Sequence, residues 1–193
     1  GLGSNALPFK SHHARIISKA ETRLNMVKHL GMCKDGLGLQ TPTRLYKLLV
    51  RPVMEYAVPI LSYSPSQLEK YERCQLKCLK SLIGLQHRGT LSAAVRQLAG
   101  IEPIKSRFDY LKLNYFQKIR LMEKDRLVHR VFKHRFRTAT TGLAGEVHAI
   151  LNDLSVWHEY RIDSSQEQSH FARYIKKKIL QKSYDIDAKA LFQ

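Results

Sequence analysis

The chain has 193 residues, 44% of them hydrophobic, which is enough to bury a sizeable core and excludes a disordered basic tail. Lysine and arginine number 33 against 16 aspartate and glutamate residues, so the formal net charge is +17. An excess of this size destabilises the compact state unless an anion binds, which favours nucleic acid as the partner and an anionic membrane surface as the next choice. The alternative is a highly soluble basic protein without a polyanionic partner.

The three cysteines, Cys33, Cys74 and Cys78, are odd in number and lack paired spacing. This argues against a disulfide framework and predicts a reducing, intracellular location. No apolar stretch approaches the ~20 residues of a membrane span, and no signal peptide is visible, so we expect no membrane partner. The first residues, Gly1 to Ser4, contain no methionine. We therefore expect a fragment of a longer protein, with residues 1–10 as a linker segment.

Apolar residues that recur at three- and four-residue steps predict a series of helices. The first spans 11–31, with Ile17, Ala20, Leu24 and Val27 on its inner face and a C-cap at Gly31. Thr41-Pro42 opens a helix to about residue 61. It should kink at one or both of Pro52 and Pro59. Its predicted apolar stripe is Leu45, Leu48, Leu49, Val53, Tyr56 and Ile60.

Six further helices are predicted towards the C-terminus. Ser64-Pro65 starts one that runs to Gly84, a short one follows at 90–99, and Glu102-Pro103 opens another that keeps its period to about residue 122. Less regular patterns predict helices at 128–136, 146–160, where Trp157 lies, and 171–184, separated by a linker at 138–145 and a polar loop at 163–169. No alternating β-branched run is present. The predicted fold is an all-α bundle of about six to eight helices.

Four segments, in order, carry a resemblance to a known family. They are Lys19-Ala20 with Arg23-Leu24-Asn25; Leu45-Tyr46-Lys47 with Arg51-Pro52 and Glu55-Tyr56; Leu68-Glu69 with Gln75, Leu79-Lys80, Ile83 and Gly84; and Gly100, Pro103 and Arg107. Together they resemble the thumb that follows the palm in reverse transcriptases of non-LTR (LINE-type) retrotransposons. The chain departs from the family pattern at Ala57, where glycine is usual, and at Lys80, where arginine is usual.

The resemblance covers residues 13 to 122 and implies a thumb-like helical domain at 11–123, followed by a basic helical extension at 124–193. The family's RNA-directed DNA polymerase uses paired palm aspartates to hold Mg²⁺, and this chain has no Asp-Asp pair. We therefore expect no enzyme activity and no cofactor in the chain itself, with Mg²⁺ and the palm domain belonging to the parent protein. For that parent the resemblance implies a location in nucleus and cytoplasm.

Two basic stretches are candidate nucleic-acid-binding sites. In the first, cations at three- and four-residue steps on one helix face would meet successive phosphates, and a hydroxyl would add a hydrogen bond. In the second, cations are interleaved with Phe132 and Phe136, which either stack on unpaired bases or fill the core. The first comprises Arg15, Lys19, Thr22 and Arg23, and the second comprises Lys118, Arg120, Arg126, Arg130, Lys133, Arg135 and Arg137. An ordinary solvated face is the alternative for both.

The remaining candidates have structural interpretations. Cys74 and Cys78 are four residues apart, without a second pair at zinc spacing, so we interpret them as buried thiols and predict no metal site. Arg51 should cap carbonyls freed by Pro52 or pair with Glu55 or Glu69. A third cluster, Arg173 with Lys176 to Lys178, is either a localisation or RNA-contact patch or a solvated face.

The sequence thus predicts a fragment that grips RNA, an RNA–DNA hybrid or DNA by its backbone. The alternative is a domesticated helical module that binds another protein and has no nucleic-acid role.

Overall fold

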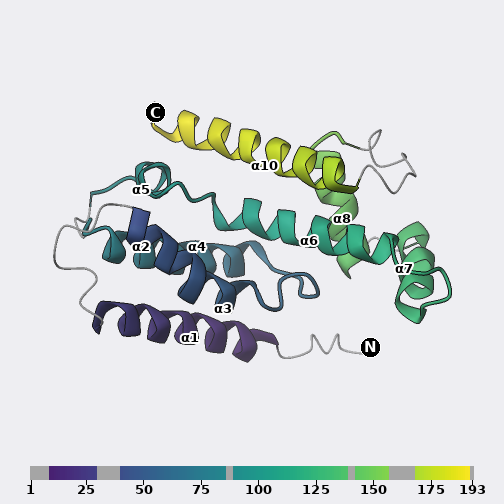
Figure 1. The fold of residues 1–193 in the computed structure, drawn as a ribbon, viewed down its shortest axis with the longest axis horizontal. Coiled ribbons are helices and arrows are strands. Elements are labelled where there is room, and N and C mark those ends of the chain that lie inside the picture. The colour runs from purple at the N-terminus through teal and green to yellow at the C-terminus, as the bar shows by residue number, and fades with distance from the viewer. Residues whose placement is uncertain (1–8, 30–39, 86–88, 139–141, 157–167, 192–193) are drawn as a thin grey trace, which may run out of the picture. The chain divides into compact units, whose positions relative to one another are not determined.

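The computed structural model describes residues 9–29, 40–85, 89–138, 142–156 and 168–191 (Figure 1). Throughout these ranges the chain forms helices joined by turns and irregular segments, without a β-strand, which confirms the all-α prediction. The helices are α1 (Phe9–His29), α2 (Gln40–Leu45), the π-helical turn η1 (Tyr46–Val50), α3 (Arg51–Glu55), α4 (Pro65–Leu82), α5 (Ser92–Ala99), α6 (Ile104–Arg120), α7 (Leu127–Thr138), α8 (Gly142–Asp153) and α10 (Gln168–Leu191). In the described part of the chain, no helix combines the length and apolar composition that a membrane crossing requires.

Local sequence signals set several helix ends as predicted. Ser64 and Gln67 form a capping box, in which each side chain accepts a hydrogen bond from the other residue's backbone N–H, and Pro65 takes the first helical position of α4. Gly100 ends α5 in the left-handed conformation, with φ at +58°. The predicted cap at Gly31 and the predicted positions of Cys33 and Trp157 lie outside the described residues.

Two helices near the C-terminus have bounds that differ from the predicted ones. Helix α8 begins at Gly142, inside the stretch predicted to be a linker, and α10 extends beyond both ends of the predicted 171–184 helix. In α8 the buried side chains of Ala144, Val147 and Leu151 hold the helix although its first turn contains two glycines. Tertiary packing therefore outweighs the low helix propensity of glycine in this segment.

Packing divides the chain into two compact units: an N-terminal unit of residues 1–56 and 64–101, and a C-terminal unit of residues 57–63 and 102–193. The domain boundaries predicted at residues 10 and 123 rest on composition and resemblance and stay predictions.

In the N-terminal unit, α1 packs against η1, α3 and α4, and α5 packs against α4. The buried face of α1 contains His13 and then, from Ile16 on, apolar side chains, while Ile17, which the sequence analysis placed on the inner face, is half-buried. Two hydrogen bonds cross this core: the Tyr46 hydroxyl donates to Oε1 of Gln75 at 2.7 Å, and Nδ1 of His13 lies 3.2 Å from the Tyr71 hydroxyl. Its main apolar side chains are those of Ile16, Ala20, Leu24, Val27, Val50, Met54, Cys78, Leu79, Leu82 and Val95.

The chain passes Pro52 without leaving the helix. Proline has no N–H, and its ring obstructs the carbonyl four residues earlier. The preceding segment, η1, adopts a wider π-helical turn, in which the Arg51 N–H donates to the carbonyl of Tyr46, five residues back. This is the expected irregularity near Pro52. The predicted apolar stripe is wrong: Tyr46, Val50 and Met54 are buried, and Leu48 and Tyr56 are exposed.

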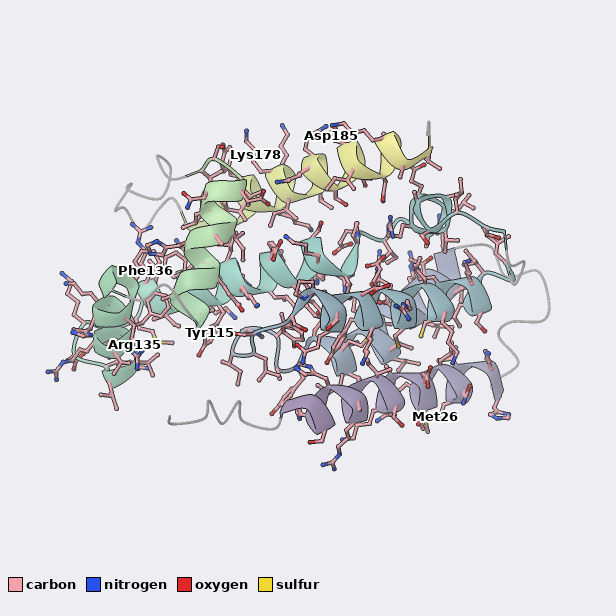
Figure 2. All side chains as sticks on the ribbon, turned by 180° about the vertical axis from the view of Figure 1, so that it is seen from behind. Met26, Tyr115, Arg135, Phe136, Lys178 and Asp185 are labelled. Carbon is pink, nitrogen blue, oxygen red and sulfur yellow. The ribbon has the colours of Figure 1, made fainter. Side chains whose placement is uncertain are left out.

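The C-terminal unit is built on α6, which packs against α7, α8 and α10. Phe116 of α6 lies 5.3 Å from the ring of Phe132 and 5.2 Å from that of Phe136, both on α7. Phe136, which is labelled in Figure 2, in turn lies 4.2 Å from the His148 ring on α8. These rings border a core of Leu113, Phe116, Val147, Ile150, Leu151, Val156, Ile175 and Ile179.

Replacing Gly100 with alanine should lower the free energy of unfolding by about 1 kcal/mol, because an L-residue with a Cβ is strained in the left-handed conformation. Chemical denaturation followed by circular dichroism measures the change. Gly89→Ala is the matched control, since Gly89 has no positive φ and the position that its new methyl group would take has no neighbouring atom within 4 Å. Equal losses in the two variants would contradict the assignment of the α5 cap.

Candidate functional site

The buried stripe of α1 places three cations along one edge of the helix. Ile16, Ala20 and Leu24 point into the core, and each directly follows a basic residue in the sequence. Consecutive side chains are about 100° apart around a helix. The basic residues therefore lie beside the packed face, on the border with the next element, and not opposite it. We call Arg15, Lys19 and Arg23, which are all exposed, the cationic row.

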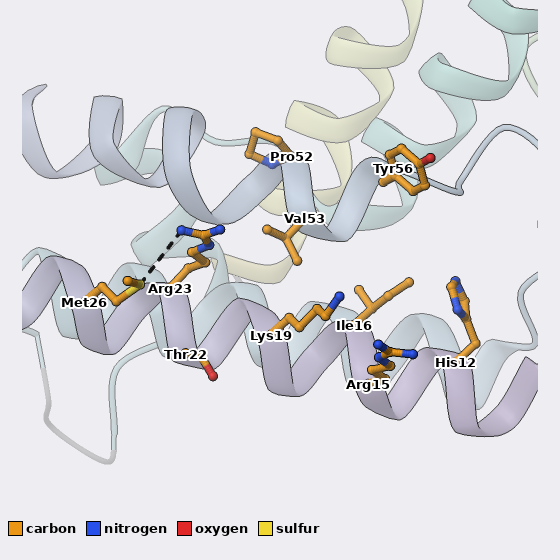
Figure 3. A pocket seen from close by; sticks show the side chains of 10 residues that line it. All are labelled: His12, Arg15, Ile16, Lys19, Thr22, Arg23, Met26, Pro52, Val53 and Tyr56. Carbon is orange, nitrogen blue, oxygen red and sulfur yellow. Dashed lines mark hydrogen bonds between the residues drawn. The ribbon is translucent and has the colours of Figure 1, made fainter.

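The cationic row lines an open groove of about 770 Å³ in the N-terminal unit (Figure 3). Figure 3 shows α1 as one wall and α3, with Pro52, Val53 and Tyr56, as the other. The groove is lined by His12, Arg15, Ile16, Lys19, Thr22, Arg23, Met26, Pro52, Val53 and Tyr56. All four residues of the first predicted site thus border one groove.

The charge of the groove is positive along its length. None of its described lining residues carries a carboxylate. The nearest acid on α1, Glu21, binds Nζ of Lys77 on α4 at 2.6 Å, and this hydrogen bond raises the pKa of Lys77. Glu21 lines a different depression, with Lys70 and Arg73. An anion in the groove would therefore meet cations without a competing carboxylate in the lining.

Two side chains of the predicted site have partners of their own. The Thr22 hydroxyl donates to the carbonyl of Ser18 at 3.0 Å, so its proton is already used within α1. The Thr22 oxygen can still accept a hydrogen bond. Because the oxygens of a phosphodiester also only accept, Thr22 in this conformation does not donate to a phosphate. Nη1 of Arg23 approaches Sδ of Met26 at 3.9 Å, a weak contact that orients the guanidinium along the helix.

Sequence reasoning missed His12, Met26, Val53 and Tyr56 as groove residues. It assigned Val53 and Tyr56 to a buried stripe, because a regular helix places them on the same face as Leu45 and Leu49. The helical period does not separate the two faces, because the buried Thr43, Tyr46, Val50, Met54 and Ala57 recur at the same three- and four-residue steps.

The second predicted site lies in the C-terminal unit and is more dispersed. Lys118, Arg130, Lys133 and Arg135 are exposed, whereas Arg120 is half-buried. Nε of Arg126 lies 3.2 Å from Oε2 of Glu123, an exposed pair. The side chain of Arg137 lies outside the described residues.

The two phenylalanines of the second site are committed to packing. Phe132 and Phe136 are half-buried and stack on each other at 5.5 Å, besides contacting Phe116. Of the two sequence interpretations, the core is therefore the one that their contacts support.

Helix α7 nevertheless leaves a second apolar surface towards solvent. Leu127, Val128 and Val131 are exposed, Leu127 by 73%. Together with Ile60, Tyr115 and Arg135 they line a groove of about 510 Å³ within the C-terminal unit. We call this the α7 groove. An amphipathic helix normally has one apolar face, so the second face of α7 needs an explanation.

The remaining sequence candidates do not assemble into a chemical site. Cys74 and Cys78 are buried, as the sequence indicated, and the hydrogen bond to Cys74 together with burial raises the pKa of Cys78. Among the described residues, no three His, Cys, Asp or Glu side chains are grouped so as to hold a metal ion. Arg173 and Lys176 to Lys178 are exposed on α10, with Nζ of Lys178 5.6 Å from the centre of the Tyr174 ring.

Arg51 has the structural role predicted for it. Its Nε donates to Oε1 of Glu55 at 2.5 Å, and the two side chains are only 10% and 14% exposed. This pair lies in the core of the N-terminal unit and does not line the groove.

Comparison with known proteins yields no relative. No protein-family model matches the chain, and neither a curated protein nor a solved structure is similar to it.

Glu55→Gln should lower the free energy of unfolding by about 2 kcal/mol, because it leaves the guanidinium of Arg51 largely desolvated beside a neutral group. Glu69→Gln is the matched control, since Glu69 forms the same i,i+4 pair with Arg73 at 2.5 Å but in the open, with side chains 62% and 69% exposed. The control should change stability by less than about 0.5 kcal/mol. Denaturant titration of both variants measures the difference, and indistinguishable midpoints would refute the role of Arg51.

Proposed function

We propose that the chain grips the backbone of nucleic acid, either RNA, an RNA–DNA hybrid or DNA, through the groove of the N-terminal unit. One observation carries the proposal: the four residues of the first predicted site border one groove with no carboxylate among its described lining residues. Positive side chains that line a concave surface attract a polyanion more strongly than the same charges spread over a convex one.

The binding mechanism is electrostatic. Successive members of the cationic row are four residues apart, which corresponds to about 6 Å along the helix axis and about 12 Å from first to last. That length covers a few nucleotides of backbone, so the three cations can contact neighbouring phosphates. Each phosphate neutralised releases condensed counterions, which makes the affinity strongly dependent on salt. The exposed cations of α6 and α7, Lys118, Arg130 and Lys133, support additional phosphate contacts.

The resemblance of residues 13 to 122 supports the same conclusion and places it in a larger protein. We propose that the chain is the thumb and connector of a non-LTR retrotransposon reverse transcriptase, an intracellular protein of nucleus and cytoplasm. On this proposal the chain binds template and primer. The polymerase reaction and its Mg²⁺ belong to the palm domain of the parent protein, and we derive no catalytic step from this chain.

A triple Arg15→Ala, Lys19→Ala, Arg23→Ala variant should bind a fluorescent RNA–DNA hybrid more weakly. The slope of log affinity against log salt concentration should become less negative by about 2 to 3, since up to three phosphate contacts are lost. Fluorescence anisotropy at several salt concentrations measures both quantities.

The control removes the same charge elsewhere in the N-terminal unit. Arg44, Lys47 and Lys70 are exposed and lie outside the groove lining. The variant with all three replaced by alanine should keep most of the wild-type dependence of affinity on salt. A wild-type affinity that does not depend on salt, or equal losses in the two triple variants, would refute the proposal.

A second candidate function, protein interaction, is favoured by the α7 groove. Exposed Leu127, Val128 and Val131 form an apolar strip, with Arg135 on the same helix face one turn further on. Arg135 lines the groove itself, and Arg130, next to Val131 in the sequence, is exposed. An apolar groove with a cationic rim is complementary to an acidic amphipathic helix that inserts its apolar face. The proposed occupant is therefore an acidic helical segment of a partner protein.

This second candidate is tested with a synthetic helical peptide that carries leucines on one face and glutamates on the other. Val131→Asp should weaken its binding at least about tenfold, because the new carboxylate meets both the apolar face and the glutamates of the peptide. Leu91→Asp is the control, an equally exposed aliphatic position in the N-terminal unit. If a peptide of the same composition with scrambled leucines binds equally well, charge alone explains the binding and the second candidate is rejected.

A further inference from the structure

One end of the groove in the N-terminal unit has an aromatic character that phosphate binding leaves unused. Tyr56, the residue that follows α3, is 88% exposed and lines this groove. On the opposite wall, His12 extends from the first part of α1 towards α3, below Tyr56 (Figure 3). Two flat rings from different helices thus border the same end of the groove.

The floor beside these rings is apolar. Ile16, which is almost fully buried, lies at the base, and Pro52 and Val53 form the adjoining part of the α3 wall. Phosphate groups gain nothing from aliphatic and aromatic surfaces, whereas the face of a nucleobase does. The groove therefore offers two chemically different surfaces, a cationic row and an aromatic end with an apolar floor.

We infer that the groove accepts single-stranded nucleic acid, with the backbone on the cationic row and an unpaired base stacked at Tyr56 and His12. This inference rests on the proposed nucleic-acid function and specifies the form of its ligand. A positively charged groove combined with exposed aromatic rings is the arrangement by which proteins hold single strands without sequence preference. In a duplex the base faces are covered by their neighbours, so a duplex can use the cations but not the rings.

The size of the groove agrees with this ligand. A volume of about 770 Å³ lies within the range of about 300 to 1,000 Å³ that is typical of small-molecule sites, which suits a base and its sugar. The cationic row then continues along α1 away from the rings, so that a strand, and not only a free nucleotide, would fill the site. Tyr56 precedes the residues of the C-terminal unit, and every residue of this site belongs to the N-terminal unit.

The test compares a fluorescent single-stranded oligonucleotide with a blunt duplex of the same length. Tyr56→Ala should weaken single-strand binding about tenfold more than duplex binding, the loss expected for one stacked base. Tyr56→Phe should restore the wild-type ratio, because phenylalanine keeps the ring. Leu48→Ala is the control: Leu48 is 71% exposed, lies in η1 of the same continuous helix and is outside the groove lining, so both affinities should stay unchanged.

A spectroscopic arm reports the stacking directly. A single strand that contains 2-aminopurine should lose fluorescence on binding to the wild type and to Tyr56→Phe, and lose less on binding to Tyr56→Ala. A free mononucleotide, added as competitor, should displace the strand only at a concentration far above that of the oligonucleotide itself. Displacement at equal concentration would show that the site is built for a nucleotide and would overturn the strand assignment.

The outcomes separate this inference from the function on which it rests. If neither single strand nor duplex binds in a salt-dependent way, the nucleic-acid function itself fails. If both bind with a normal salt slope but Tyr56→Ala lowers the two affinities equally, or leaves the 2-aminopurine signal intact, only the aromatic subsite is refuted.

Discussion

The N-terminal unit depends on how the chain accommodates Pro52. Without an N–H at this position, a regular helix would leave a carbonyl without a partner and force the pyrrolidine ring against the preceding turn. In the π-helical turn at Tyr46 to Val50, the N–H of Arg51 reaches back five residues to the carbonyl of Tyr46. The chain then continues through Pro52 as α3, where Arg51 is buried with Glu55, and Val53 and Tyr56 line the groove. The wall of the groove that faces the cationic row is therefore the segment around this proline.

The large positive charge of the chain becomes directional through local pairing. Several acidic side chains are engaged by nearby cations away from the groove, as Glu21 is by Lys77 and Glu72 by Arg96 at 2.6 Å. Arg15 and Lys19 border the groove without an acid in its described lining. Exposed ion pairs stabilise a fold only slightly, so their more important effect here concerns the position of negative charge: they hold these carboxylates away from the groove. A uniform distribution of the same residues would give equal net charge and a weaker site.

The helices were predictable where the signal is local. Ser64-Pro65 and Gly100 each act within a few residues, and both helix ends were predicted from them; the structure adds the Ser64–Gln67 capping box and the left-handed conformation of Gly100. The segment after residue 121 was harder, since Gly142 and Gly145 resemble a linker by composition but α8 is held by the burial of Val147 and Leu151. The interpretation of Phe132 and Phe136 could not be settled from spacing either, because a ring that stacks on a base and a ring that packs on Phe116 occupy the same helical positions.

Composition and helical period were enough to establish the all-α class, the positive charge and the row of cations on the first helix, because these are properties of short segments. What that row faces depends on tertiary packing instead. The groove requires α1 and α3 to be placed side by side, and its aromatic end requires Tyr56 to leave the core. Both follow from packing between residues distant in sequence. A pattern along one helix shows which residues share a face, but it does not show which face another helix covers.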